Sequence, residues 1–157
     1  MRKQLIDVPI VYASDLAITW GNDSRYWRWV PHEDHPHVKV AELIIVYWLE
    51  VRGRYKMSYL EPWEKYEAFF VLKLKKTITQ AITFTLEPPG APKQERKVDL
   101  SVLPRNEWIR VKIGEFKTKE VGQSADEVKF SLTGYDDHPL LSKEGLVIEG
   151  VVFLPVF

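Results

Sequence analysis

The sequence predicts an all-β protein, a jelly-roll-like antiparallel β-sandwich with little or no helix. Short segments of the 157-residue chain alternate apolar and polar residues with a period of two. Clusters of Gly, Pro, Asn, Asp and Ser separate these segments, and the chain has no convincing helical apolar period. Many short strands with turn signals between them are typical of β-sandwiches.

The first strands flank a dense turn. Residues 1–12 are expected to be a loose lead-in to a single domain that spans residues 1–157. Residues 16–20 alternate and predict one strand, and residues 25–30 predict the next. Between them, residues 21–24 read Gly-Asn-Asp-Ser, which is turn chemistry. The pattern therefore predicts a hairpin-like unit whose tip carries polar side chains.

The longest apolar segment, residues 38–51, is predicted to be one strand that ends at Gly53. Its odd positions from 41 onward are apolar, and its middle is apolar on both faces, as in a fully buried strand. Trp48 lies inside this segment and is predicted to belong to the core. Residues 54–65 are predicted to be irregular, and the role of Trp63 within them stays open.

Further alternating segments complete the predicted sheets. Residues 88–97 contain three prolines followed by charged residues and predict a loop. The other segments predicted as strands are 66–75, 78–86, 98–102, 109–113, 128–133 and 146–153.

Composition excludes several function classes. The 22 basic and 22 acidic residues cancel, which argues against a dominant electrostatic interaction with nucleic acid or an anionic membrane. The chain has no cysteine, so neither disulfides nor thiol chemistry contribute. No apolar run resembles a signal peptide or a membrane span. We therefore expect a cytoplasmic protein.

An aromatic cluster surrounds the first turn. Trp20, Tyr26, Trp27 and Trp29 lie within ten positions, mixed with amide, hydroxyl and guanidinium groups. These rings would fill the core of many sandwiches, but the turn places them at a rim, where loops carry function. Such a mixture suits a ligand with a flat apolar face and many hydroxyls, such as a sugar.

Polar side chains in the same stretch are candidates for orienting that ligand. Asn22, Asp23 and Tyr26 offer hydrogen bonds to hydroxyl or acetamido groups. Trp27 and Trp29 share one face of the predicted strand, so one is expected to line the site and the other to anchor the strand. The sequence alone does not decide between them.

The motifs around this cluster resemble those of the phloem protein 2 lectins, the group that includes Nictaba. The first is Leu-Ala-Ile-Thr-Trp at 16–20 followed by Tyr-Trp-Arg-Trp at 26–29. Similar blocks follow in the family's order across nearly the whole chain, and the short, cysteine-free format is most similar to cucurbit phloem lectins. The further matching segments are 40–51, 66–74, 108–116, 127–128 and 145–150.

The resemblance implies a non-catalytic lectin that binds N-acetylglucosamine oligomers without a cofactor. It implies a homodimer in phloem sap, cytosol or nucleus. It assigns sugar stacking to Trp20 and Trp27 and a polar contact to Glu127. A second family glutamate falls on Gly134 here, so a neighbour such as Asp136 would have to supply its contact. The family's loop at 52–62 is also altered.

Two other clusters of polar residues are expected to have no catalytic or metal-binding role. His32, His35 and His37 lie on one loop, but Pro36 forbids a metal-binding helix there, so a solvated loop is favoured over a metal site. Asp136 and Asp137 are favoured as turn residues over a catalytic pair.

The residues are also compatible with two rival functions. One is an RNA- or protein-interaction module for transport in the phloem, although neutral net charge argues against strong RNA binding. The other is a chito-oligosaccharide hydrolase, which would need a carboxylate pair facing the aromatic rings.

Overall fold

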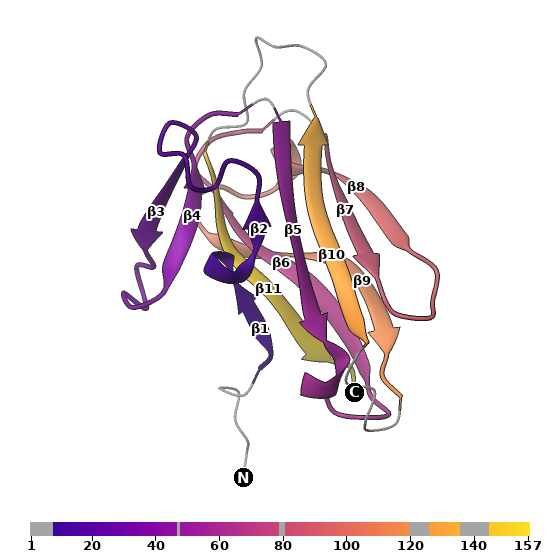
Figure 1. The fold of residues 1–157 in the computed structure, drawn as a ribbon. Coiled ribbons are helices and arrows are strands. Elements are labelled where there is room, and N and C mark those ends of the chain that lie inside the picture. Colours follow the sequence, from indigo (N-terminus) through magenta and orange to yellow (C-terminus); the bar gives the residue numbers. More distant parts are fainter. Residues whose placement is uncertain (1–7, 47, 79–80, 120–125, 136–144) are drawn as a thin grey trace.

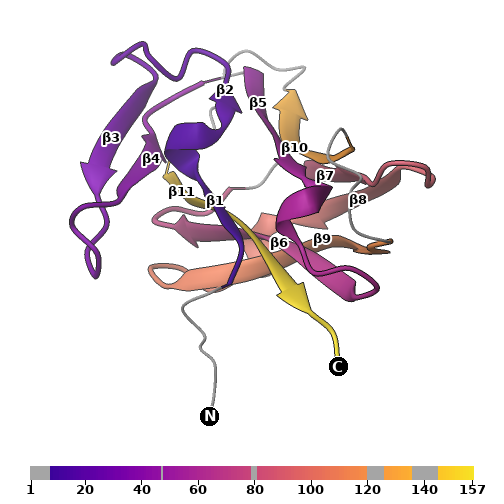
Figure 2. The same cartoon turned by 60° about the horizontal axis from the view of Figure 1, so that its bottom comes forward.

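The computed structural model describes residues 8–46, 48–78, 81–119, 126–135 and 145–157. Two antiparallel sheets face each other across one core, which confirms the predicted β-sandwich (Figures 1 and 2). The helical segments among these residues are three single 3₁₀ turns: η2 (Ala13–Asp15), η3 (Met57–Tyr59) and η4 (Leu100–Val102). No helix in the described part of the chain is long and apolar enough to cross a membrane.

The larger sheet has the order β3-β4-β11-β6-β9, and β1 also pairs with β11. Strand β11 is therefore central and is buried along most of its length. The strands of this sheet are β1 (Ile10–Tyr12), β3 (Trp27–Pro31), β4 (Lys39–Leu43), β6 (Lys65–Leu74), β9 (Trp108–Lys117) and β11 (Leu146–Pro155).

The smaller sheet has the order β2-β5-β10-β7-β8. Alternate residues of each strand point away from the core, and on the long strands of this sheet most of these outward residues are polar. Its strands are β2 (Ala17–Ile18), β5 (Trp48–Lys56), β7 (Ala81–Glu87), β8 (Gln94–Asp99) and β10 (Glu127–Tyr135).

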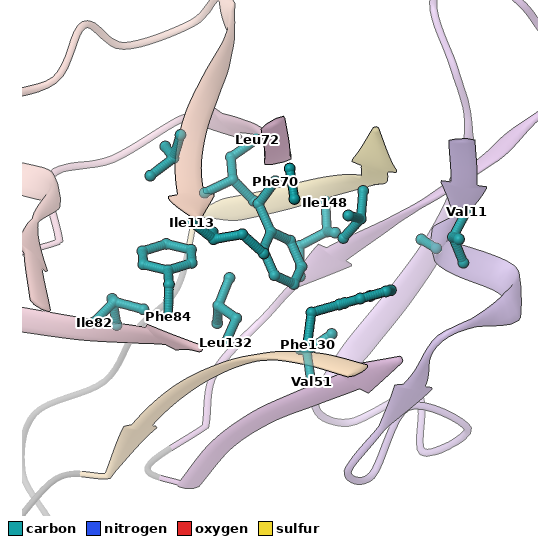
Figure 3. Packing of buried hydrophobic residues seen from close by; sticks show 14 of the residues in the cluster. Val11, Val51, Phe70, Leu72, Ile82, Phe84, Ile113, Phe130, Leu132 and Ile148 are labelled. Atoms are coloured by element: carbon teal, nitrogen blue, oxygen red, sulfur yellow. The ribbon is translucent and has the colours of Figure 1, made fainter. Parts of the chain in front are cut away.

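The core lies between the two sheets, and its side chains come from the alternating positions that the sequence marks. Strand β6 alternates half-buried and buried residues along its full length. Phe70, Phe84 and Phe130 meet near the centre, with Phe70 at 5.6 Å from Phe84 and 6.1 Å from Phe130 between ring centroids (Figure 3). This rigid core holds the loops at the two ends of the sandwich.

The prediction of one long strand over residues 38–51 is wrong. The chain leaves the larger sheet after β4 and enters the smaller sheet at β5 (Figure 1). Because the residues between the two strands pass from one sheet to the other, they need not alternate, which explains their apolar run. Trp48 consequently begins a strand at the rim and is 47% exposed, so its placement in the core is also wrong.

Other boundaries also differ from the predictions. Strand β5 continues through Gly53 to Lys56, because Gly53 packs against Phe130 where no larger side chain fits. Strand β8 occupies part of the predicted charged loop, since an edge strand tolerates charged side chains. Strand β2 has only two residues, because the chain turns directly after it.

Candidate functional site

The loop between β2 and β3 is a succession of tight turns. The amide of Gly21 donates to the carbonyl of Ile18 at 2.9 Å, and the amide of Asp23 donates to that of Trp20 at 3.0 Å. The amide of Tyr26 then donates to the carbonyl of Asp23 at 3.0 Å. These bonds confirm the predicted turn and give each residue of the loop a defined direction.

Trp20 projects from this loop in a strained backbone conformation. Its φ is +62°, a region that costs an L-residue roughly 1–2 kcal/mol. Its side chain is 49% exposed, and its ring lies 5.1 Å from that of Tyr26 at a tilt of 33°. The amide of the preceding Thr19 donates to the carbonyl of Glu50 at 3.0 Å and ties the loop to β5. The fold therefore maintains an exposed indole at an energetic cost, which is typical of functional positions.

The structure assigns Trp27 a different role than the resemblance implied. Trp27 is 2% exposed and belongs to the core cluster. The prediction that its ring stacks on a ligand is contradicted, because β3 points this side chain between the sheets. Trp29 is half-buried, and its Nε1 donates to the carbonyl of Gly21 at 2.9 Å. Both residues thus have structural roles next to the loop, and Trp20 is the tryptophan that the loop exposes to solvent.

Charge on the loop is paired internally. Arg25 donates to both carboxylate oxygens of Asp23, from Nε at 3.0 Å and from Nη2 at 2.7 Å. These hydrogen bonds lower the pKa of Asp23 to about 2 and raise that of Arg25. The guanidinium also lies 5.2 Å from the centre of the Tyr26 ring. Asp23 therefore orders the loop, and the exposed Asn22 is better placed to contact a ligand.

Two open hollows flank the turn. One of about 520 Å³ is lined by Trp20, Asn22, Ser24 and their neighbours. The other, of about 330 Å³, shares Gly21, Asn22 and Ser24 with the first. Its remaining lining comes from the β3 residues Trp27, Arg28 and Trp29 and from Ile44. An open site of this shape suits a ligand that lies on the surface.

Strand β5 adds aromatic and acidic groups that sequence reasoning placed elsewhere. Trp48 and Glu50 lie on the outer face of the strand that binds Thr19. The indole Nε1 of Trp48 donates to Glu50 at 3.0 Å, and Arg52 also pairs with this carboxylate. The hydrogen bond from Trp48, followed by that from Arg52, lowers the pKa of Glu50. The signal in the sequence is the charged Glu50, which together with Glu42 interrupts the apolar residues of the 38–51 segment.

Glu127 does not lie beside the aromatic loop, so that expectation is wrong. Its register partner on β5 is Lys56, six residues beyond Glu50. At about 3.3 Å per residue, about 20 Å of strand separates Glu127 from the loop's anchor. Thr133 is the β10 residue paired with Glu50. Asp136, the other predicted polar contact, lies outside the described residues, as does Asp137.

The histidine loop is only partly solvated. His32 is 4% exposed, stacks on Trp108 at 5.0 Å and approaches Glu149 at 3.3 Å through Nε2. Its Nδ1 accepts the amide of Asp34 at 3.0 Å. His35 and His37 are exposed. Among the described residues, no group of three or more His, Cys, Asp or Glu side chains has the geometry of a metal site.

Comparison with known proteins identifies the lineage. The model of the phloem protein 2 family matches residues 8–155. The chain belongs to the phloem protein 2 family. A lectin of Luffa acutangula is 36% identical over 150 residues, which cover 93% of this chain and 69% of that protein. Protein PHLOEM PROTEIN 2-LIKE A1 of Arabidopsis thaliana is 33% identical and is covered to 61% by the match. This chain therefore spans about two thirds of these relatives.

Solved structures support the fold at low sequence identity. The C-terminal CBM6 module of the laminarinase LamC from Zobellia galactanivorans matches with a TM-score of 0.50 and 10% identity, over 94% of this chain and 98% of that one. The Podospora anserina GH26-CBM35 β-(1,4)-mannanase matches with a TM-score of 0.51 and 7% identity, over 96% of this chain and 28% of that one. At such identities the likeness concerns the β-sandwich alone.

Proposed function

We propose that this phloem protein 2 chain is a non-catalytic lectin that binds N-acetylglucosamine oligomers at the Trp20 loop. One observation carries the proposal: the fold holds Trp20 exposed and strained beside Tyr26 at the rim of a sandwich. Membership of the phloem protein 2 family and the similarity to a lectin of Luffa acutangula support it.

The geometry suggests how a sugar would be held. One pyranose ring packs its apolar face on the indole of Trp20, and Asn22 and the hydroxyl of Tyr26 bond to its polar groups. The exposed Trp48, with Glu50, extends the surface along β5 for a second sugar unit. A few such contacts give affinities of roughly micromolar to millimolar per site, rising with oligomer length.

Titration of labelled protein with chitotriose tests this assignment. The backbone amide resonances of Gly21–Ser24 should shift on binding. The Trp20→Ala variant should weaken binding by about 2 kcal/mol, roughly 30-fold, because stacked apolar area is lost. Trp20→Phe should keep part of the affinity, since it retains an aromatic ring.

Trp63→Ala is the matched control, because Trp63 is another exposed tryptophan with a positive φ, remote from this loop. It should leave the affinity measured at Gly21–Ser24 unchanged. Unaltered affinity in Trp20→Ala, or the absence of any shift with chitotriose, would refute the assignment.

We also propose a homodimer and a cytoplasmic or nuclear location, as the resemblance implies. Two sites per dimer would raise avidity for multivalent glycans without new contacts. Light scattering of the purified protein measures the mass, and a value of one chain would refute the dimer. A fluorescent fusion in plant cells tests the location, and secretion would refute it.

A further inference from the structure

The end of the sandwich opposite the Trp20 loop also carries an exposed tryptophan. The connection from β5 to β6 contains η3 and then residues 60–64, at the bottom in Figure 1, while the β2–β3 loop is at the top. Trp63 in this connection is 73% exposed, and Tyr59 is 62% exposed. Both side chains are large and bury little surface in this position. Packing in the core therefore does not account for an aromatic residue at either site.

Trp63 also repeats the backbone feature of Trp20. Its φ is +59°, and among the described residues only Trp20, Trp63 and Asn106 combine a positive φ with a side chain. Asparagine tolerates this conformation, whereas a bulky aromatic residue is an outlier there. Both outliers are exposed tryptophans, and they lie at opposite ends of the molecule. A residue that is strained and exposed contributes little to folding, which points to a role in binding.

The connection is held in place by a buried threonine. The hydroxyl of Thr118 donates to the carbonyl of Glu61 at 2.6 Å and accepts the amide of Glu64 at 2.9 Å. The amide of Thr118 donates to the carbonyl of Glu64 at 2.8 Å. On the other side, the amide of Glu61 donates to the hydroxyl of Tyr66 at 3.1 Å. These bonds enclose the backbone on both sides of Trp63, so its indole is displayed on a preorganised loop.

The residues of this connection suit a sugar better than an apolar protein surface. The ring of Tyr59 packs edge-on against Tyr55 at 5.3 Å, and the ammonium of Lys56 lies 5.8 Å from its centre. Glu61 is exposed and Glu64 is half-exposed beside the tryptophan. Carboxylates accept hydrogen bonds from hydroxyl groups, whereas charged residues are depleted in the buried core of a protein–protein interface.

We propose that Trp63 and Tyr59 form a second carbohydrate-binding site, so that one chain binds glycans at both ends. The proposal rests on the lectin function above. The ligand class is a pyranose-containing oligosaccharide that stacks on Trp63 and bonds to the carboxylates of Glu61 and Glu64. A single chain of this kind bridges two glycans without dimerisation.

The test follows each end by its own signals during titration with chitotriose. The backbone amide resonances of Glu61, Trp63 and Glu64 report the second site, and those of Gly21–Ser24 report the first. Trp63→Ala should weaken binding at residues 61–64 by at least about tenfold and leave the first site unchanged. Trp20→Ala should do the reverse, and each variant thus serves as the matched control for the other.

The outcomes separate the two proposals. Shifts confined to Gly21–Ser24 would refute the second site and leave the lectin function standing. Shifts confined to residues 61–64 would support the second site and refute the Trp20 site. Shifts at residues 61–64 that grow with protein concentration without ligand, together with a larger mass by light scattering, would instead identify a contact between copies of the chain and overturn the proposal. No shift at either end refutes both.

Discussion

Replacing Trp27 with phenylalanine separates a structural role from a binding role. Trp27 is 2% exposed, and its Nε1 has no hydrogen-bond partner in the structure. A buried tryptophan removes up to about 250 Å² from water, so at about 25 cal/mol per Å² its burial is worth at most about 6 kcal/mol. Trp27→Ala should therefore lose about 3–5 kcal/mol of the free energy of unfolding, a large part of the roughly 5–15 kcal/mol of a domain.

Trp27→Phe should behave very differently. The smaller ring gives up about 1–2 kcal/mol of burial, but the substitution also removes an unpaired buried N–H, which costs about 1–3 kcal/mol. We expect stability within about 1 kcal/mol of the wild type by urea denaturation. Affinity for chitotriose should change less than about twofold, because the ring does not reach the surface. A Trp27→Phe protein that folds as the wild type does but binds at least about tenfold more weakly would refute this reasoning.

Three further predictions concern the surrounding structure. The Asp23–Arg25 pair lowers the pKa of Asp23 from 3.8 to about 2, so its contribution to loop order is present above about pH 4 and is lost as the pH falls through about 2. Circular dichroism and binding at low pH should show this loss, and Asp23→Asn should abolish the pH dependence. Thr118→Val should cost about 1–3 kcal/mol in urea denaturation, because the backbone of Glu61 and Glu64 loses its bonds to the buried Thr118 hydroxyl; an unchanged midpoint would contradict this. Gly150→Ala should destabilise by at least about 1–3 kcal/mol, since its Cβ would lie 2.1 Å from the carbonyl oxygen of Val11; equal stability would show that β1 moves freely.

Much of the fold followed from short-range patterns. The alternation in Tyr66–Leu74 and in the residues of β10 predicted which side chains enter the core, and the Gly-Asn-Asp-Ser turn was placed correctly. These features depend on neighbours one to four positions away. The apolar segment 38–51 was wrongly predicted to be one strand. Apolar residues that connect two sheets have the same sequence pattern as a fully buried strand.

The site was predicted less completely than the fold. Trp20 and the turn beside it were identified from the sequence, and Trp48 was assigned to the wrong environment. Glu127 was expected beside the Trp20 loop, but it lies at the opposite end of β10. Matching sequence motifs do not show in which direction a strand runs. The exposed Trp63 remained ambiguous, since nothing local indicates that Thr118, 55 residues later, holds its loop.

The sequence by itself determined the fold class, the family motifs and the turn that carries Trp20, because periodicity and turn chemistry act over a few residues. Only the tertiary structure decided which tryptophans face the core and which face solvent. That choice depends on which strands pair and in what register, and these pairings join residues far apart in the chain. The same long-range contacts set Trp20 and Trp63 at opposite ends of one sandwich.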